Sequence, residues 1–198
     1  GLGDVYKRQV SCYLKGKNMI YNHIVAAIDE ARTSRLALKH AVELTRLSGA
    51  QLTLLTVVNP TEFMALSPEF LRYENYEVAA QSEGEHILNE AEQYARHEGL
   101  QKVDKKIIIS TKGVKDMAEK LIRKAEESGA DLIVLGTHGR TGLMHFLMGS
   151  FAETVLRQTT LPVLILRSRA SEEDEEENDT QDKRQKKISE KKDVSTET

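Results

Sequence analysis

The sequence predicts an α/β domain built on a doubly wound, five-stranded parallel sheet with helices on both faces. Short, continuous apolar runs alternate along the chain with longer amphipathic segments. Runs that are apolar throughout indicate strands buried on both faces, as in parallel sheets. Parallel strands need crossover connections, which are right-handed and usually helical. A single domain spanning about 20–168 follows from this alternation.

The predicted elements are, in order, a strand at 23–28, a helix at 33–49, a strand at 51–58, a helix from 67 to about 99, a strand at 105–110, a helix at 114–129, a strand at 131–136, a helix at 150–159 and a strand at 162–167. Ser67 and Pro68 favour a helix start, as N-cap and first helical residue. Gly49 and Gly129 are typical C-terminal stops.

Each of the three longer helices has an apolar stripe at helical spacing. These stripes predict the faces that cover the sheet. They are Leu36, Leu38, Ala41, Val42, Leu44 and Leu47 in the first helix, Val78, Ile87, Leu88, Ala91, Tyr94 and Ala95 in the second, and Met117, Ala118, Leu121, Ile122 and Ala125 in the third.

Composition limits the class of protein. The chain has 198 residues, of which 39% are hydrophobic and 30% charged, so one folded core and long charged segments share it. No apolar run is long enough to span a membrane, and the first residues do not resemble a secretory signal. The single cysteine, Cys12, excludes an internal disulfide and suits the cytoplasm. The net charge is −3, and no basic stripe points to nucleic acid.

Both ends of the chain differ from the middle. Residues 1–18 are expected to be a disordered extension or a non-native one, since "GLGDVYKRQ" resembles a translated sequencing adapter; Met19 is then a candidate start. Residues 169–198 carry an acidic block and then a basic block at 183–187, with very few large apolar residues. Such a tail is expected to be disordered. It is either an interaction segment or a solvated tail whose charges compensate.

A glycine-rich segment, "DLIVLGTHGRTGLMHFLMGSF" (131–151), follows the fourth predicted strand. Gly136 comes directly after that strand, where the lack of a Cβ would leave room for a ligand, and Gly139, Gly142 and Gly149 permit positive φ or close backbone approach. Gly149 and Ser150 open a helix, whose free N–H groups favour an anion. The segment is neither GxGxxG nor a Walker A loop, because Gly149 stands where the P-loop lysine would precede the hydroxyl residue.

The spacing G-x2-G-x9-G-[ST] is similar to the nucleotide-binding signature of the universal stress protein family. The stretch "DLIVLGTHGRTGL…GSFAETVLRQTTLPVLIL" resembles that family almost throughout. "HIVAAIDEARTSRLALKHAVELT" resembles its first strand and helix, with an Asp just past the strand, and "LLTVV" adds to the likeness. The resemblance covers about 20–168. It implies a Rossmann-like, adenine-nucleotide alpha-hydrolase-like fold that binds ATP, or AMP or ADP, with or without Mg²⁺.

The resemblance also implies which residues bind the nucleotide. Asp29 would lie near the adenine or ribose, and Val57 would touch the base. The full implied set is Ala27, Asp29, Val57, Gly136, Gly139, Arg140, Gly149, Ser150 and Phe151. Two positions depart from the family pattern: Phe151 stands where members often have Val, and Glu30-Ala31 stand where Gly-Ser or Gly-Thr is common. The Glu30 carboxylate would either weaken anion binding or help to hold a divalent cation.

Several of these positions have a plainer interpretation. Asp29 could cap the loop or a nearby helix, Arg140 could face solvent, and His138 could be a hydrogen-bonding spacer instead of a phosphate ligand. Met144, Phe146, Leu147 and Met148 are expected to pack under the loop. The remaining histidines show no metal-ligand spacing.

The function expected on these grounds is adenine-nucleotide binding by a regulatory protein of the stress response, with little or no catalysis. The last strand, Pro162 to Arg167, is apolar and lies at a sheet edge, and strands of this kind in the family often pair with a second subunit, so a homodimer is expected. Two alternatives stay open: a slow ATP hydrolase or nucleotidyl-transfer enzyme on the same fold, and a nucleotide-independent dimeric interaction module.

Overall fold

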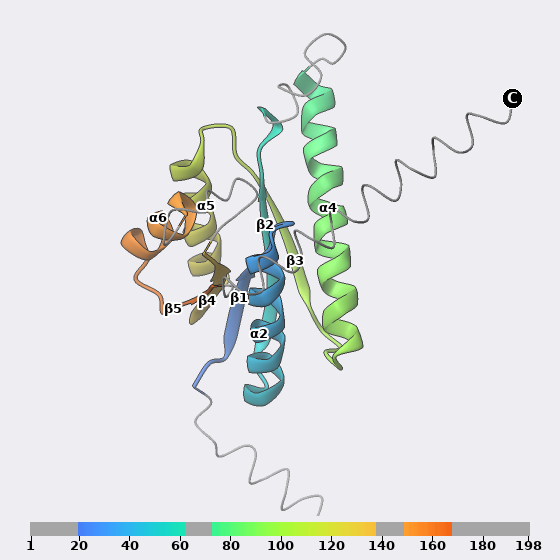
Figure 1. Cartoon of the computed structure of the whole chain (residues 1–198), viewed down its shortest axis with the longest axis vertical. Helices are drawn as coiled ribbons and strands as arrows, with labels where there is room; N and C mark the ends of the chain where they lie inside the picture. Colours follow the sequence, from blue (N-terminus) through green and yellow to red (C-terminus); the bar gives the residue numbers. More distant parts are fainter. Residues whose placement is uncertain (1–19, 62–72, 138–148, 168–198) are drawn as a thin grey trace, which may run out of the picture. The chain divides into compact units, whose positions relative to one another are not determined.

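The computed structural model describes residues 20–61, 73–137 and 149–167, which form one parallel sheet between two helical layers (Figure 1). The strands are β1 (His23–Ala27), β2 (Gln51–Val58), β3 (Asp104–Ile109), β4 (Leu132–Gly136) and β5 (Val163–Leu166). The helices are α2 (Arg32–Ser48), α4 (Tyr73–His97), α5 (Val114–Glu127) and α6 (Ser150–Gln158). The predicted start of the second long helix, at Ser67 and Pro68, lies outside the described residues.

The sheet confirms the predicted fold class. Its strand order is β3-β2-β1-β4-β5, and every neighbouring pair is parallel. The chain builds the sheet outward from β1 to β3 and then returns to the other side of β1 with β4. The direction of winding therefore reverses between β1 and β4, and this is where ligands bind in doubly wound sheets.

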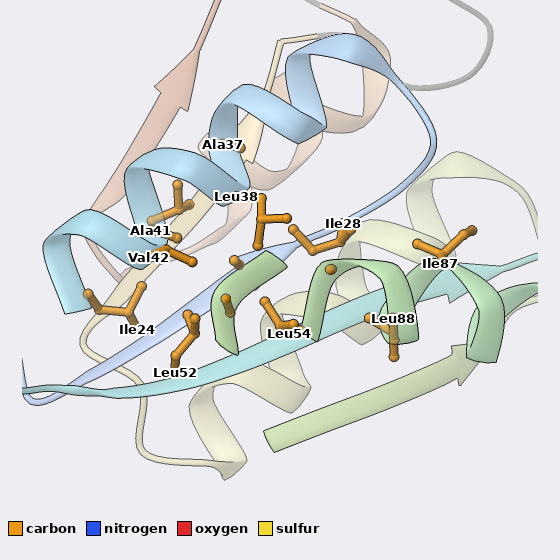
Figure 2. Packing of buried hydrophobic residues seen from close by; sticks show 14 of the residues in the cluster. Ile24, Ile28, Ala37, Leu38, Ala41, Val42, Leu52, Leu54, Ile87 and Leu88 are labelled. Atoms are coloured by element: carbon orange, nitrogen blue, oxygen red, sulfur yellow. The ribbon is translucent and has the colours of Figure 1, made fainter. Parts of the chain in front are cut away.

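One face of the sheet is covered by α2 and α4 (Figures 1 and 2). Ile24 of β1 and Leu52 of β2 pack there against Val42 of α2, and all three are at most 3% exposed. Ile87 and Leu88 of α4 belong to the same cluster as Leu54 of β2 (Figure 2). Successive residues of a strand point to opposite faces of the sheet. A strand is therefore apolar throughout only if the second face is buried as well.

The opposite face is covered by α5 and α6. Val25, Leu55, Ile133 and Leu135 of the central strands are at most 1% exposed there. They pack against α5, including Leu121, and against the buried residues of α6, which are Ala152 and Val155. Burial on both faces is the property that the apolar runs predicted.

Two residues of the predicted apolar stripes are exposed. Leu47 of α2 is 75% exposed, and Val78 of α4 is 69% exposed. Leu47 lies in the last turn of α2, and Val78 lies near the start of α4. Helical spacing places a residue on the inward face, but it does not show how far along the helix the sheet continues beneath that face.

The amino-terminal edge of the sheet is held by a polar network that the sequence did not indicate. Asp131, just before β4, accepts hydrogen bonds from the backbone N–H groups of Asn22 (2.8 Å) and His23 (3.0 Å) and from the Asn22 side chain (3.1 Å). The buried His23 ring bridges Ser128 O (2.9 Å) and Thr53 Oγ1 (2.8 Å). Partial burial raises the pKa of the Asp131 carboxyl, but these hydrogen bonds outweigh it, so the pKa lies below its usual value.

We expect Asp131→Asn to destabilise the fold by about 1–3 kcal/mol near neutral pH, because an amide NH₂ would face backbone N–H donors. Since the folded-state pKa is lowered, the carboxylate's contribution is present above its unfolded value of 3.8 and is lost as pH falls through the folded-state value. The free energies of unfolding of wild type and variant, measured with urea, should therefore become equal in acid. Asp104→Asn, at an exposed carboxylate, is the control; an Asp131→Asn effect that persists unchanged in acid would contradict the assignment.

Candidate functional site

The carboxyl ends of β1 and β4 lie next to each other and form the centre of the candidate site. β1 pairs with β4 up to Ala26↔Val134. Ala27 and Asp29 follow on one strand, and Gly136 follows on the other. The sequence therefore assigned three site residues to two chain segments that the structure brings together at the reversal point of the sheet.

Asp29 orders the turn after β1. One of its carboxylate oxygens accepts the Ala31 backbone N–H at 2.9 Å, and its own backbone N–H donates to Ser34 Oγ at 2.8 Å. The side chain is half-buried. The hydrogen bond from the Ala31 N–H supports the alternative in which Asp29 caps the loop. Contact between Asp29 and a ligand stays a prediction. Glu30, next to it, is exposed.

Ala27, Val57 and Phe151 share the face of the sheet that α5 and α6 cover. All three are partly buried and pack against the same hydrophobic cluster. Val57 lies near the end of β2, beside Ile108 of β3. The Phe151 ring is therefore part of the packing beneath the site, and its backbone N–H, in the first turn of α6, is the group that remains for a ligand.

Gly136 has a packing role that the sequence did not indicate. A Cβ at this position would lie 2.5 Å from Thr33 Oγ1, 2.7 Å from the Thr33 carbonyl carbon and 2.8 Å from Thr33 Cβ. The missing side chain makes room for the start of α2. This close approach fixes α2 against the end of β4, while nucleotide contact by Gly136 stays a prediction.

The start of α6 is tied to the end of β4. The Gly149 N–H donates to Thr137 O at 2.7 Å, and the Glu153 N–H donates to Gly149 O at 3.0 Å to open the helix. Gly149 has φ −71° and ψ 154°, so its backbone is extended and does not adopt the positive φ that glycine permits. The N-cap residue, Gly149, has no side chain with which to cap the helix. The N–H groups of the first turn and the exposed Ser150 hydroxyl can therefore receive an anion.

The two other predicted phosphate residues, Gly139 and Arg140, lie outside the described residues. The same holds for Gly142, His138 and the apolar residues at 144 and 146–148. The described structure places the two ends of this segment, Thr137 and Gly149, in hydrogen-bond contact.

A polar cluster at the same edge was missed in the sequence. Buried Ser110, just after β3, donates to an Asp116 carboxylate oxygen at 2.6 Å, and Lys120 contacts that oxygen at 3.1 Å and Ile109 O at 2.9 Å. The hydrogen bonds from Ser110 and Lys120 hold the Asp116 pKa below its usual value. The spacing Asp116 to Lys120 is an ordinary i,i+4 helical pair, so only the tertiary position of Ser110 identifies the cluster.

No group of three or more His, Cys, Asp or Glu side chains in residues 20–61, 73–137 and 149–167 could hold a metal ion. None of the helices described is both long and apolar enough to cross a membrane.

Comparison with known proteins places the chain in a family. The model described as "Universal stress protein family" matches residues 20–167. A universal stress protein of Methanocaldococcus jannaschii, MJ0531, is 32% identical over 77% of this chain and 85% of its own length. Two solved structures share the fold: a universal stress protein in complex with cAMP (23% identity, TM-score 0.52, covering 74% of this chain and 98% of that one) and the Archaeoglobus fulgidus protein in complex with dAMP (22%, 0.53, 75% and 99%).

We expect Gly136→Ala to destabilise the fold by about 1–3 kcal/mol, because the new methyl group would overlap Thr33. Thr33→Ser in the same chain should restore little, since the backbone carbon of residue 33 stays within 2.7 Å. Gly84→Ala is the matched control: its Cβ would meet only the Ile107 side chain, at 3.0 Å, which can move. Thermal unfolding measures all three, and a Gly136→Ala variant as stable as wild type would remove the packing role.

Proposed function

This chain belongs to the universal stress protein family, and we propose that it is a regulatory protein that binds an adenine nucleotide, ATP, ADP or AMP, at the carboxyl ends of β1 and β4. The proposed domain spans 19–168 and acts in the cytoplasm in the stress response, with residues 1–18 and 169–198 as extensions.

The observation that carries this proposal is the start of α6, at Gly149, beside the end of β4. The bond from the Gly149 N–H to Thr137 O (2.7 Å) holds this helix end at the point where the sheet reverses. Backbone N–H groups and the helix dipole then face the site, and the N-cap Gly149 has no side chain that would compete for these groups. A phosphate group is the ligand for which such an arrangement is suited, and we propose that Gly139 and Arg140 add to it.

The nucleoside is proposed to bind toward β1 and β2. Ala27 and Val57 offer apolar surface on one face of the sheet, and Asp29 offers a carboxylate beyond the end of β1. An apolar surface with a few polar groups is typical of small-molecule sites. The cAMP and dAMP complexes of the two related proteins support an adenine base as the ligand.

Binding without efficient hydrolysis is the favoured activity. In P-loop enzymes a lysine precedes the hydroxyl residue and contacts the β- and γ-phosphates. Here that position is Gly149, whose N–H is already bonded within the chain. Slow hydrolysis or nucleotidyl transfer, with Mg²⁺ held by the nucleotide and carboxylates such as Asp29, remains the alternative function.

A homodimer formed through β5 is the proposed assembly. All four residues of β5 are apolar and only partly buried, and β4 is its sole partner in the described sheet. The opposite edge differs: Asp104, Lys105 and Lys106 of β3 are exposed, and Lys105 is bonded to Asn89 and Glu92 of α4. Charged edges disfavour strand addition, whereas apolar edges favour it. β5 is therefore the edge suited to a second copy.

We expect isothermal titration to show binding of ATP, ADP or AMP to the wild-type chain, with and without Mg²⁺. Ser150→Asp should abolish that binding, because a carboxylate in the first turn of α6 would repel a phosphate while its charge suits the helix dipole and preserves the fold. Thr160→Asp, which adds the same charge after the far end of α6, is the control and should bind normally.

No heat with any adenine nucleotide would contradict the proposed function and favour the interaction module. Normal binding by Ser150→Asp would move the phosphates away from α6. Phosphate release at many turnovers per hour would favour the hydrolase alternative.

Leu164→Glu should convert the dimer into monomers, because the new carboxylate would be buried between two β5 strands without a partner. Multi-angle light scattering of the variant and of Lys106→Glu, a control on the opposite edge, measures this. An unchanged Leu164→Glu dimer would show that the interface lies elsewhere.

A further inference from the structure

α6 and β5 are joined to each other at both ends. At one end they are connected covalently through residues 159–162. At the other end they are connected by two hydrogen bonds that meet at Thr137, just after β4. The two elements therefore form a closed ring, and a restraint on one of them is transmitted to the other.

Thr137 makes the first connection. Its N–H donates to Leu166 O at 2.8 Å, at the end of β5, and its C=O accepts the Gly149 N–H at 2.7 Å, at the start of α6. Thr137 is only 6% exposed, so water competes little for these backbone groups. The backbone of one residue, Thr137, thus fixes both the end of β5 and the start of α6, where the anion is proposed to bind.

The short turn after α6 makes the second connection. The Thr159 N–H bonds to Val155 O at 3.0 Å, and Thr159 Oγ1 accepts the Leu161 N–H at 3.1 Å. Pro162 O then accepts the Ile133 N–H at 3.0 Å, which starts the pairing of β5 with β4. The turn is too short to absorb a movement of α6 without moving β5.

From this ring we propose that nucleotide binding at the start of α6 and pairing of β5 with a second copy strengthen each other. The inference rests on the proposed function. A bound phosphate would restrain the first turn of α6 and, through Thr137 and the turn after the helix, both ends of β5. A restrained edge strand loses less conformational entropy when a second strand adds to it. By linkage, dimerisation must then also raise nucleotide affinity.

β5 is suited to respond in this way. It is the shortest of the five strands, with four residues, and each of them is only partly buried. In the described sheet it has β4 on one side alone. Short, half-covered strands belong to the less stable parts of a fold, so their order is sensitive to small restraints.

The test is the dimer dissociation constant of the full-length chain, measured by analytical ultracentrifugation with and without a saturating adenine nucleotide that titration has shown to bind. We expect nucleotide to lower this constant by about fivefold or more. An unchanged or raised constant would overturn the coupling while leaving nucleotide binding, and thus the proposed function, intact. Absence of binding in the titration would instead contradict the proposed function and the coupling together.

Thr159→Ala tests the route of the coupling. It removes the acceptor of the Leu161 N–H without altering the proposed phosphate or pairing groups. Nucleotide should then change the dimer constant by a much smaller factor than in wild type. Thr160→Ala, at the exposed neighbour in the same turn, should behave as wild type. Equal coupling in both variants would overturn the route through this turn.

Hydrogen exchange gives a second measurement that does not depend on dimer formation. At concentrations where the chain is monomeric, nucleotide should slow exchange of the backbone amides of β5 relative to those of β3, the opposite edge. Unchanged exchange in β5 under saturating nucleotide would overturn the proposal even if Thr159→Ala proved unstable.

Discussion

The hydrogen bond from the Gly149 N–H to Thr137 O is the contact on which the proposed site depends. It closes the segment between β4 and α6 and brings the start of that helix back to the end of the strand. Together with the packing of Ala152 and Val155 on the sheet, it fixes the N–H groups of α6 relative to β1, after which Asp29 lies. The helix end and the reversal of the sheet are each common features, and their juxtaposition makes this edge suited to an anion.

The close approach of α2 to β4 fixes the part of the proposed site that lies beyond the end of β1. Thr33 fills the space that a side chain at Gly136 would need, and Ser34 holds the backbone of Asp29. The turn that presents Asp29 is therefore set by helix packing. A glycine that a motif assigns to ligand binding can in this way be required first by the core, because an added methyl group meets backbone atoms that cannot move aside.

The two edges of the sheet differ in chemistry. β3 has exposed charged residues and an ion pair to α4, which disfavour strand addition, while β5 is an apolar, half-buried strand. Since α6 is joined to β5 through Thr137 at one end and through residues 159–162 at the other, the edge proposed for a second copy is joined to the helix proposed for the phosphate group. Ligand binding and assembly would then share one structural element.

The sequence by itself determined the element order, the parallel sheet and the family, because buried strands, helical stripes and glycine spacing are local patterns. It also placed Ala27, Asp29 and Gly136 at strand ends that the sheet brings together. Only the tertiary structure decided that Gly136 accommodates Thr33, that Phe151 packs into the core, that Leu47 and Val78 extend beyond it, and that Ser110 meets Asp116. These facts depend on distances between segments far apart in the chain, which periodicity and spacing do not encode.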